Sequence, residues 1–299
     1  MPIDGLMLGI LLGLAASACW GVADFLARGV TRRYGDFETL LGVLVVGGIG
    51  VALYVVPQGV APVLAGDRLT IVITALLAVG GYAALYRALK VGVLSVVSPI
   101  AAGNAVIPVG LALILLGERP LPWQLAGGAC VLAGVALLSI QKGGPHPEGQ
   151  NLQEGAAPPR GRIALGVAPA LLCALLFGMS LFGMKLSVDR IDPNSVALWV
   201  RIIGVAALLL WLLAARRVTL PPAGCRLPLV AAGLLDAAAF VFFCEALTHT
   251  LLSLVAPVSA TIPLFTVTLA RVLLKERLSG MQQTGLALTL SGLALVALD

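Results

Sequence analysis

Five ionisable side chains lie within long apolar stretches of this 299-residue chain: Asp24, Arg87, Arg201, Asp236 and Glu245. A charge near the centre of a bilayer is costly, so each of these groups needs a partner or a role. At a rise of about 1.5 Å per helical residue, Asp24 and Arg87 fall near one membrane surface, and Arg201 and Glu245 near the other. We therefore predict an ion pair near each surface, which either opens and closes in turn or is static and partly snorkelled.

Asp236 differs from the other four, because it falls near the middle of its stretch with no cation expected at its depth. A lone buried carboxyl favours its neutral form. Asp236 is therefore predicted either to exchange protons, which makes the proton a candidate coupling ion, or to be a hydrogen-bonded structural group.

Aromatic side chains make up 5% of the chain, and four of them recur at matching places in its two halves. Trp20 aligns with Phe177, and Tyr82 aligns with Phe240. If the four face one another, they form an apolar cage around a small ligand. The alternative is ordinary packing or anchoring at the membrane interface, and the deep positions of Trp20 and Phe177 disfavour anchoring.

Proline recurs in the fourth apolar stretch of each half. The candidate cavity-lining residues of these two stretches are Ser98, Pro99 and Asn104, and Pro257, Ser259 and Thr261. Proline removes a backbone donor, and loosened turns within a bilayer are tolerated beside a wet cavity. The alternative is a simple kink. Asn104 is the strongest candidate, because an amide in mid-helix needs a partner or water.

The elements that position these residues are membrane helices. Hydrophobic residues form 60% of the chain and charged residues only 11%, with a mean hydropathy of +1.05. This composition excludes an ordinary soluble enzyme. The fold class predicted is an all-α integral membrane protein with ten transmembrane helices, near residues 6–27, 38–57, 69–89, 93–116, 123–141, 163–184, 195–214, 227–248, 251–274 and 281–298.

The chain divides into two related halves. Residues 142–162 form a polar linker between a first five-helix repeat over 1–141 and a second over 163–299. Residues 88–141 align with 246–299 without a gap. Because five is odd, the second repeat enters the membrane from the opposite side. Such inverted repeats accompany alternating access around a site between the halves.

Other chemistries find little support. The chain has two histidines, His146 and His249, and no catalytic motif, so we expect no enzyme activity. Its cysteines form no CxxC pair, and we expect no metal and no cofactor. The net charge of +5 lies in short loops, so we expect a lipid bilayer rather than nucleic acid as the partner. A passive channel for small solutes stays open as an alternative to a carrier.

The closing motif of each half carries a resemblance. It reads Leu-Gly-Glu-Arg-Pro over 116–120 and Leu-Lys-Glu-Arg-Leu over 274–278, and each Glu-Arg pair is predicted to cap a helix. With the aromatic-glycine element of each first helix and the prolines of each fourth helix, the chain resembles the drug/metabolite transporter superfamily, EamA type. The aromatic amino-acid exporters of the YddG type are a plausible neighbour.

The resemblance implies ten helices, a central cavity and export of small metabolites such as amino acids across a bacterial inner membrane. We expect a monomer. The loops that follow odd-numbered helices carry most of the lysines and arginines, which by the positive-inside rule places both termini outside. The resemblance implies both termini inside, so the orientation is left open.

Overall fold

The structure is a computed structural model that describes residues 3–91, 94–139, 160–273 and 279–298, and every regular element there is helical. The elements of the first half are α1 (Ile3–Tyr34), α2 (Asp36–Val55), η1 (Val56–Gln58), α3 (Arg68–Val91), α4 (Leu94–Ala102), η2 (Gly103–Ala105), α5 (Val106–Leu115) and α6 (Pro122–Ser139). Those of the second half are α7 (Arg160–Val188), α8 (Pro193–Ala214), α9 (Ala223–His249), α10 (Leu252–Ser259), α11 (Ile262–Leu273) and α12 (Gly280–Val296).

Nine segments of the described chain are long and apolar enough to cross a membrane. The tenth expected span corresponds to α12, which has 17 residues and is shorter than each of the nine. The prediction of an all-helical membrane protein is confirmed. The count of ten spans and the inverted relation of the halves stay predictions, and most of the predicted linker lies outside the described residues.

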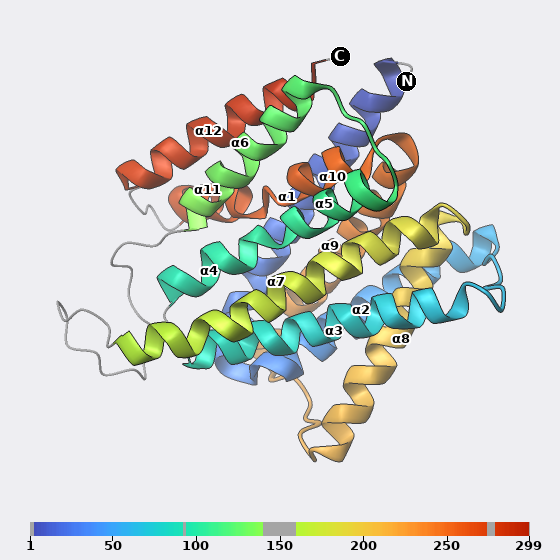
Figure 1. Cartoon of the computed structure of the whole chain (residues 1–299). Coiled ribbons are helices and arrows are strands. Elements are labelled where there is room, and N and C mark those ends of the chain that lie inside the picture. Colours follow the sequence, from blue (N-terminus) through green and yellow to red (C-terminus); the bar gives the residue numbers. More distant parts are fainter. Residues whose placement is uncertain (1–2, 92–93, 140–159, 274–278, 299) are drawn as a thin grey trace.

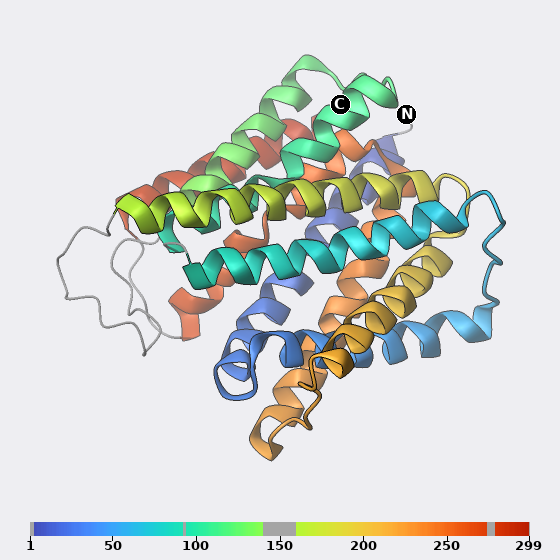
Figure 2. The same ribbon diagram turned by 60° about the horizontal axis from the view of Figure 1, so that its bottom comes forward.

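The two halves interlock instead of forming separate lobes (Figures 1 and 2). α1 packs along α9, α3 packs along α7, and α6 packs along α12. By the sequence alignment α1 corresponds to α7 and α3 to α9, so the first two contacts are equivalent. The largest helix contacts therefore join the halves to each other.

Glycines allow α6 and α12 to approach closely. A Cβ atom on Gly127 would lie 2.7 Å from the Gly292 carbonyl oxygen, and one on Gly292 would lie 2.6 Å from that of Gly127. The same relation joins Gly134 and Gly285, at 2.7 and 2.8 Å. Small residues of this kind are the usual means by which helices pack in lipid.

Both termini lie at one face of the bundle (Figure 1). We call it the termini face; α1 begins there, and residues 116–121 and 189–192 connect helices there. We call the opposite face, where α1 ends at Tyr34 and α6 ends at Ser139, the far face.

The fourth helix of each half is interrupted, as the prolines predicted. A 3-10 turn, η2, separates α4 from α5, and the second interruption lies at residues 260–261, between α10 and α11. Pro108 and Pro263 each fall within the first turn of the helix that follows, where a missing N–H costs no hydrogen bond.

Candidate functional site

A buried ion pair joins α8 and α9 near the middle of the bundle. Arg201 Nη1 donates to Asp236 Oδ2, and Nη2 donates to the Asp236 carbonyl oxygen at 3.4 Å. Trp20 Nε1 from α1 donates to the other carboxylate oxygen at 3.1 Å. The side chains of Arg201 and Asp236 are only 1% and 7% exposed. The expectation of a lone Asp236 was therefore wrong, because the long arginine side chain spans the difference in depth between the two residues.

Arg201 is enclosed by apolar and small residues. Its guanidinium carbon lies 4.3 Å from the centre of the Phe240 ring, at which distance the cation and the ring attract each other. A Cβ atom on Gly48 of α2 would lie 3.3 Å from the Arg201 side chain, so the glycine leaves room for it. Arg201 Nε is buried and has no hydrogen-bond partner among the described residues, so one N–H of the guanidinium is unsatisfied in this state.

The four predicted aromatic residues form two pairs across the halves of the chain. The Trp20 and Phe240 rings meet edge to face with centroids 5.7 Å apart, and the Tyr82 and Phe177 rings do so at 4.8 Å. The geometry is the favourable one for aromatic pairs. The two pairs are equivalent in the repeat, and the first is joined to the Arg201–Asp236 ion pair through Trp20 and Phe240.

A small cavity of about 30 Å³ lies between α2, α3, α8 and α9. Its lining includes the side chains of Leu44, Ala78, Val79, Tyr82, Arg201 and Phe240. Arg201 is the one charged residue of this lining. A space of this size holds water or a small functional group. A larger ligand enters only if the surrounding helices move apart.

The glycine of each aromatic-glycine element lets a first helix approach the interrupted helix of the other half. A Cβ atom on Gly178 would lie 2.7 Å from the Asn104 carbonyl oxygen, and one on Gly21 would lie 3.1 Å from that of Ile262. Asn104 and Ile262 are equivalent in the repeat. Each element thus contributes an aromatic ring to one pair and a close backbone contact at one interruption.

The predicted polar residues of the fourth helices have mixed surroundings. Ser98, Pro99 and Asn104 are half-buried, whereas Pro257, Ser259 and Thr261 are buried. The Ser259 and Thr261 hydroxyls donate to backbone carbonyls three residues earlier. Thr261 also shares a 2.8 Å hydrogen bond with Ser17 of α1. The second-half hydroxyls therefore satisfy the end of α10. The lining of the cavity described above contains none of these six residues, so their cavity-lining role stays a prediction.

The predicted Arg201–Glu245 pair is not formed, because Arg201 is paired with Asp236. Glu245 instead contacts His249 one turn along α9, at 3.3 Å. Asp24 and Arg87 are both exposed toward the far face, and their pairing stays a prediction.

Glu118 is a contact residue that sequence reasoning undervalued. Its carboxylate accepts hydrogen bonds from the first residues of α10, in the other half of the chain. The predicted capping role is thus confirmed for the first closing motif, but across the halves and not within one. The alignment singled out Ser253 as a repeated residue, but it did not show that Ser253 meets Glu118 of the other half. The second closing motif, 274–278, lies outside the described residues.

Comparison with known proteins decides the family. The sequence model of the EamA-like transporter family matches residues 7–140 and again residues 164–298. The chain belongs to this family. As such it is a multi-pass membrane transporter of small solutes, and each match covers one half of the transporter.

Two similar proteins show the extent of the likeness in sequence and in fold. An uncharacterized protein of Methanocaldococcus jannaschii is 29% identical over 133 residues, which are 96% of its own chain and 44% of the transporter. It thus has the length of one half. A crystal structure of a protein matches with a TM-score of 0.78 and 20% identity, over 96% of both chains. That match shows a shared fold.

Proposed function

We propose that this transporter exports small amphipathic metabolites, amino acids or related zwitterions, by alternating access around the site between its two halves. The observation that carries the proposal is the buried Arg201–Asp236 ion pair beside a cavity with otherwise uncharged walls. The direction of transport and the location in a bacterial inner membrane are the family expectation. We further propose that it works as a monomer.

The ion pair suits a ligand with both charges. A carboxylate fits the guanidinium of Arg201, whose Nε has no protein partner. An ammonium group fits the Asp236 carboxylate. A zwitterion that exchanges the internal pair for two new pairs leaves no charge unpaired in the low-dielectric interior, whereas a ligand with one charge strands the other.

The apolar part of the ligand has a matching place. Tyr82 lines the cavity with Arg201, and its ring packs on Phe177. The site is thus charged toward Trp20 and Phe240 and uncharged toward Tyr82 and Phe177. A cavity of about 30 Å³ is smaller than any amino acid, so we infer that the state described is one in which the site is contracted.

Proton coupling through Asp236 would, under this proposal, involve the ion pair and not a lone carboxyl group. In the state described, both carboxylate oxygens of Asp236 accept a hydrogen bond, one from Trp20 and one from Arg201. Substrate binding and proton exchange would then both require the Arg201–Asp236 ion pair to open, and would compete for the Asp236 carboxylate.

Counterflow in liposomes tests the proposal. With unlabelled leucine or phenylalanine inside, uptake of the same labelled amino acid is expected to be accelerated, because a carrier returns faster when loaded. N-acetyl derivatives, which lack the ammonium group, should not accelerate it. Uptake that is indifferent to internal amino acid would contradict a carrier and favour a passive channel. Equal acceleration by the acetylated compounds would contradict the zwitterion.

Replacing Tyr82 with alanine is expected to raise the half-saturating concentration of phenylalanine in counterflow by roughly tenfold, because the Tyr82–Phe177 pair loses one ring. The matched control is Trp211→Ala. Trp211 pairs with Phe37 at the same centroid distance, 4.8 Å, but is 47% exposed. Equal effects of both substitutions would mean that the Tyr82–Phe177 pair is not part of the binding site.

A further inference from the structure

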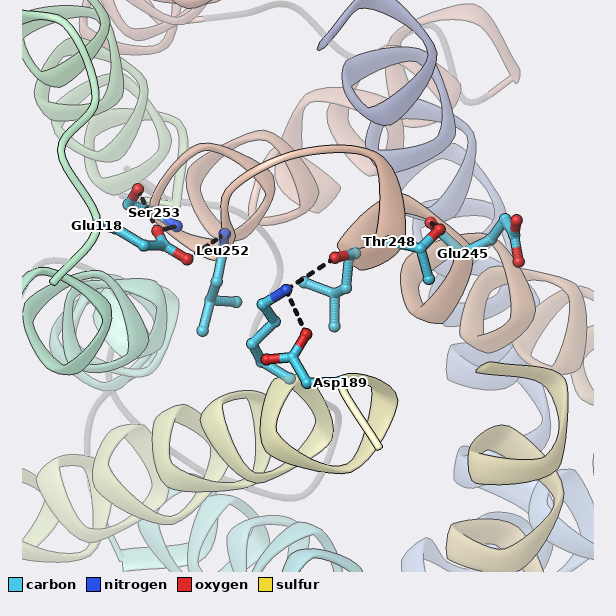
Figure 3. A network of polar contacts seen from close by, with 8 residues as sticks. Glu118, Asp189, Glu245, Thr248, Leu252 and Ser253 are labelled. Carbon is cyan, nitrogen blue, oxygen red and sulfur yellow. Dashed lines mark hydrogen bonds and ion pairs between the residues drawn. The ribbon is translucent and has the colours of Figure 1, made fainter. Parts of the chain in front are cut away.

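A carboxylate from one half of the chain caps a buried helix of the other half at the termini face. Glu118 lies in the connection between α5 and α6. Its oxygens accept from the backbone N–H of Leu252 at 3.0 Å, from that of Ser253 at 2.9 Å and from the Ser253 hydroxyl at 2.6 Å. Figure 3 shows the side chain reaching Leu252 and Ser253 at the start of α10. The first N–H groups of a helix have no partner in the helix itself, and a negative charge there is favourable.

The helix held in this way is enclosed, and its counterpart is not. All eight residues of α10 are buried. In α4, which aligns with it, Val97 is buried, whereas Val96 and the residues from Ser98 to Ala102 are half-buried. α5 packs against α10 at the termini face, whereas among the described residues α4 and α11 do not pack in this way at the far face. The interrupted helices therefore meet at one face and separate at the other.

Outside the interrupted helices, described residues make contacts at both faces. At the far face the two halves are joined by an ion pair, in which Arg217 contacts Glu38 at 3.1 Å. At the termini face a second contact lies near Glu118. Lys185 of α7 donates to Asp189 at 2.7 Å and to the Leu247 carbonyl oxygen of α9 at 3.0 Å. The interrupted helices are thus the elements whose arrangement distinguishes the two faces.

We propose that Glu118 is a latch that keeps the termini face shut, and that opening this face requires its carboxylate to leave the start of α10. The inference rests on the proposed alternating access. Three hydrogen bonds to a charged acceptor are strong enough to favour one arrangement, yet they can be exchanged for water because Glu118 is only half-buried. In this role Glu118 holds the start of α10 in place and does not contact the substrate.

Two native cysteines on α9 allow a direct test. Cys244 is fully buried and belongs to the same core as Leu252, Val255 and Ala256, near the termini face. Cys225 is 2% exposed and belongs to a separate core near the far face. Each is kept as the sole cysteine, with the other four replaced by alanine. Modification by a charged thiol reagent is then timed on the full-length protein in detergent micelles.

Glu118→Gln is expected to speed modification of Cys244 by roughly tenfold, because the amide loses the charge and turns a donor toward the helix start. Ser253→Ala should give a smaller increase. The control Arg119→Gln alters the exposed neighbouring charge and should change nothing. Cys225 should stay protected in all three variants.

Two results would overturn the latch. One is equal modification of Cys244 in Glu118→Gln and Arg119→Gln. The other is an equal increase at Cys225, which would mean that Glu118 stabilises the whole fold and not one face. Labelling needs no substrate, so a differential response at Cys244 in a protein that fails the counterflow assay would support the latch while rejecting the proposed function.

Discussion

Replacing Arg201 with methionine is expected to destabilise the transporter by about 3–5 kcal/mol and to abolish transport. The substitution leaves the Asp236 carboxylate buried, with the Trp20 N–H as its one remaining side-chain partner in the described part of the chain. Unfolding in mixed micelles with increasing SDS measures the first effect, and counterflow measures the second. Asp236→Leu alone should behave similarly, because it strands the guanidinium.

The double variant Arg201→Met, Asp236→Leu separates folding from function. Removing both charges of a buried pair is often neutral or stabilising, so the stability should return to near that of the parent protein. Transport should not return, because no group remains to hold a charged ligand. A double variant that transports zwitterions normally would place the substrate elsewhere.

The pair formed by Arg217 and Glu38 is the matched control. Its atoms are 3.1 Å apart, but the Arg217 side chain is 50% exposed. The Glu38 side chain is only 9% exposed, so the control removes Glu38 and keeps Arg217. Glu38→Gln leaves behind an arginine that solvent reaches, so it should cost no more than about 1 kcal/mol and should leave transport intact. A cost equal to that of Arg201→Met would mean that burial is not what makes the central pair important.

Gly292→Ala is the second substitution with a large expected effect. The new Cβ atom would lie 2.6 Å from the Gly127 carbonyl oxygen and 2.7 Å from the Val131 nitrogen, both backbone atoms that cannot turn aside. α6 and α12 must then separate, and we expect a loss of about 1–3 kcal/mol together with reduced yield of folded protein.

Gly280→Ala is the control for this substitution, in the same helix. A Cβ atom there meets nothing within 4 Å, and alanine is the better helix former by up to about 1 kcal/mol. It should therefore be neutral or slightly stabilising in the same SDS unfolding assay. Similar losses at both positions would show that α12 tolerates no added side chain for reasons other than its contact with α6.

Much of the architecture could be predicted from the sequence. Bilayer thickness requires apolar stretches of a certain length, and these stretches can be counted. Repetition of Trp20–Gly21 as Phe177–Gly178, and of the fourth-helix prolines, located the aromatic pairs and the interruptions. These features are local or periodic, so the order of residues along the chain contains them.

The ion pairs were predicted less well, for a geometric reason. Counting residues along a helix yields depth in the membrane but not the direction in which a side chain points. Depth matched Arg201 with Glu245 and left Asp236 alone, whereas helix tilt and the reach of arginine join Arg201 to Asp236. The same limit applied to Glu118, whose partner lies in the other half of the chain.

The sequence by itself determined that this protein is an all-helical membrane protein of two related halves, because hydropathy and repetition need no knowledge of packing, and its match to a transporter family supplied the function. The tertiary structure alone decided which charges meet, which aromatic rings face each other and where the interrupted helices pack together. Those depend on how helices from the two halves pack around one another, and in a chain with so few charges each such contact changes what the site can bind.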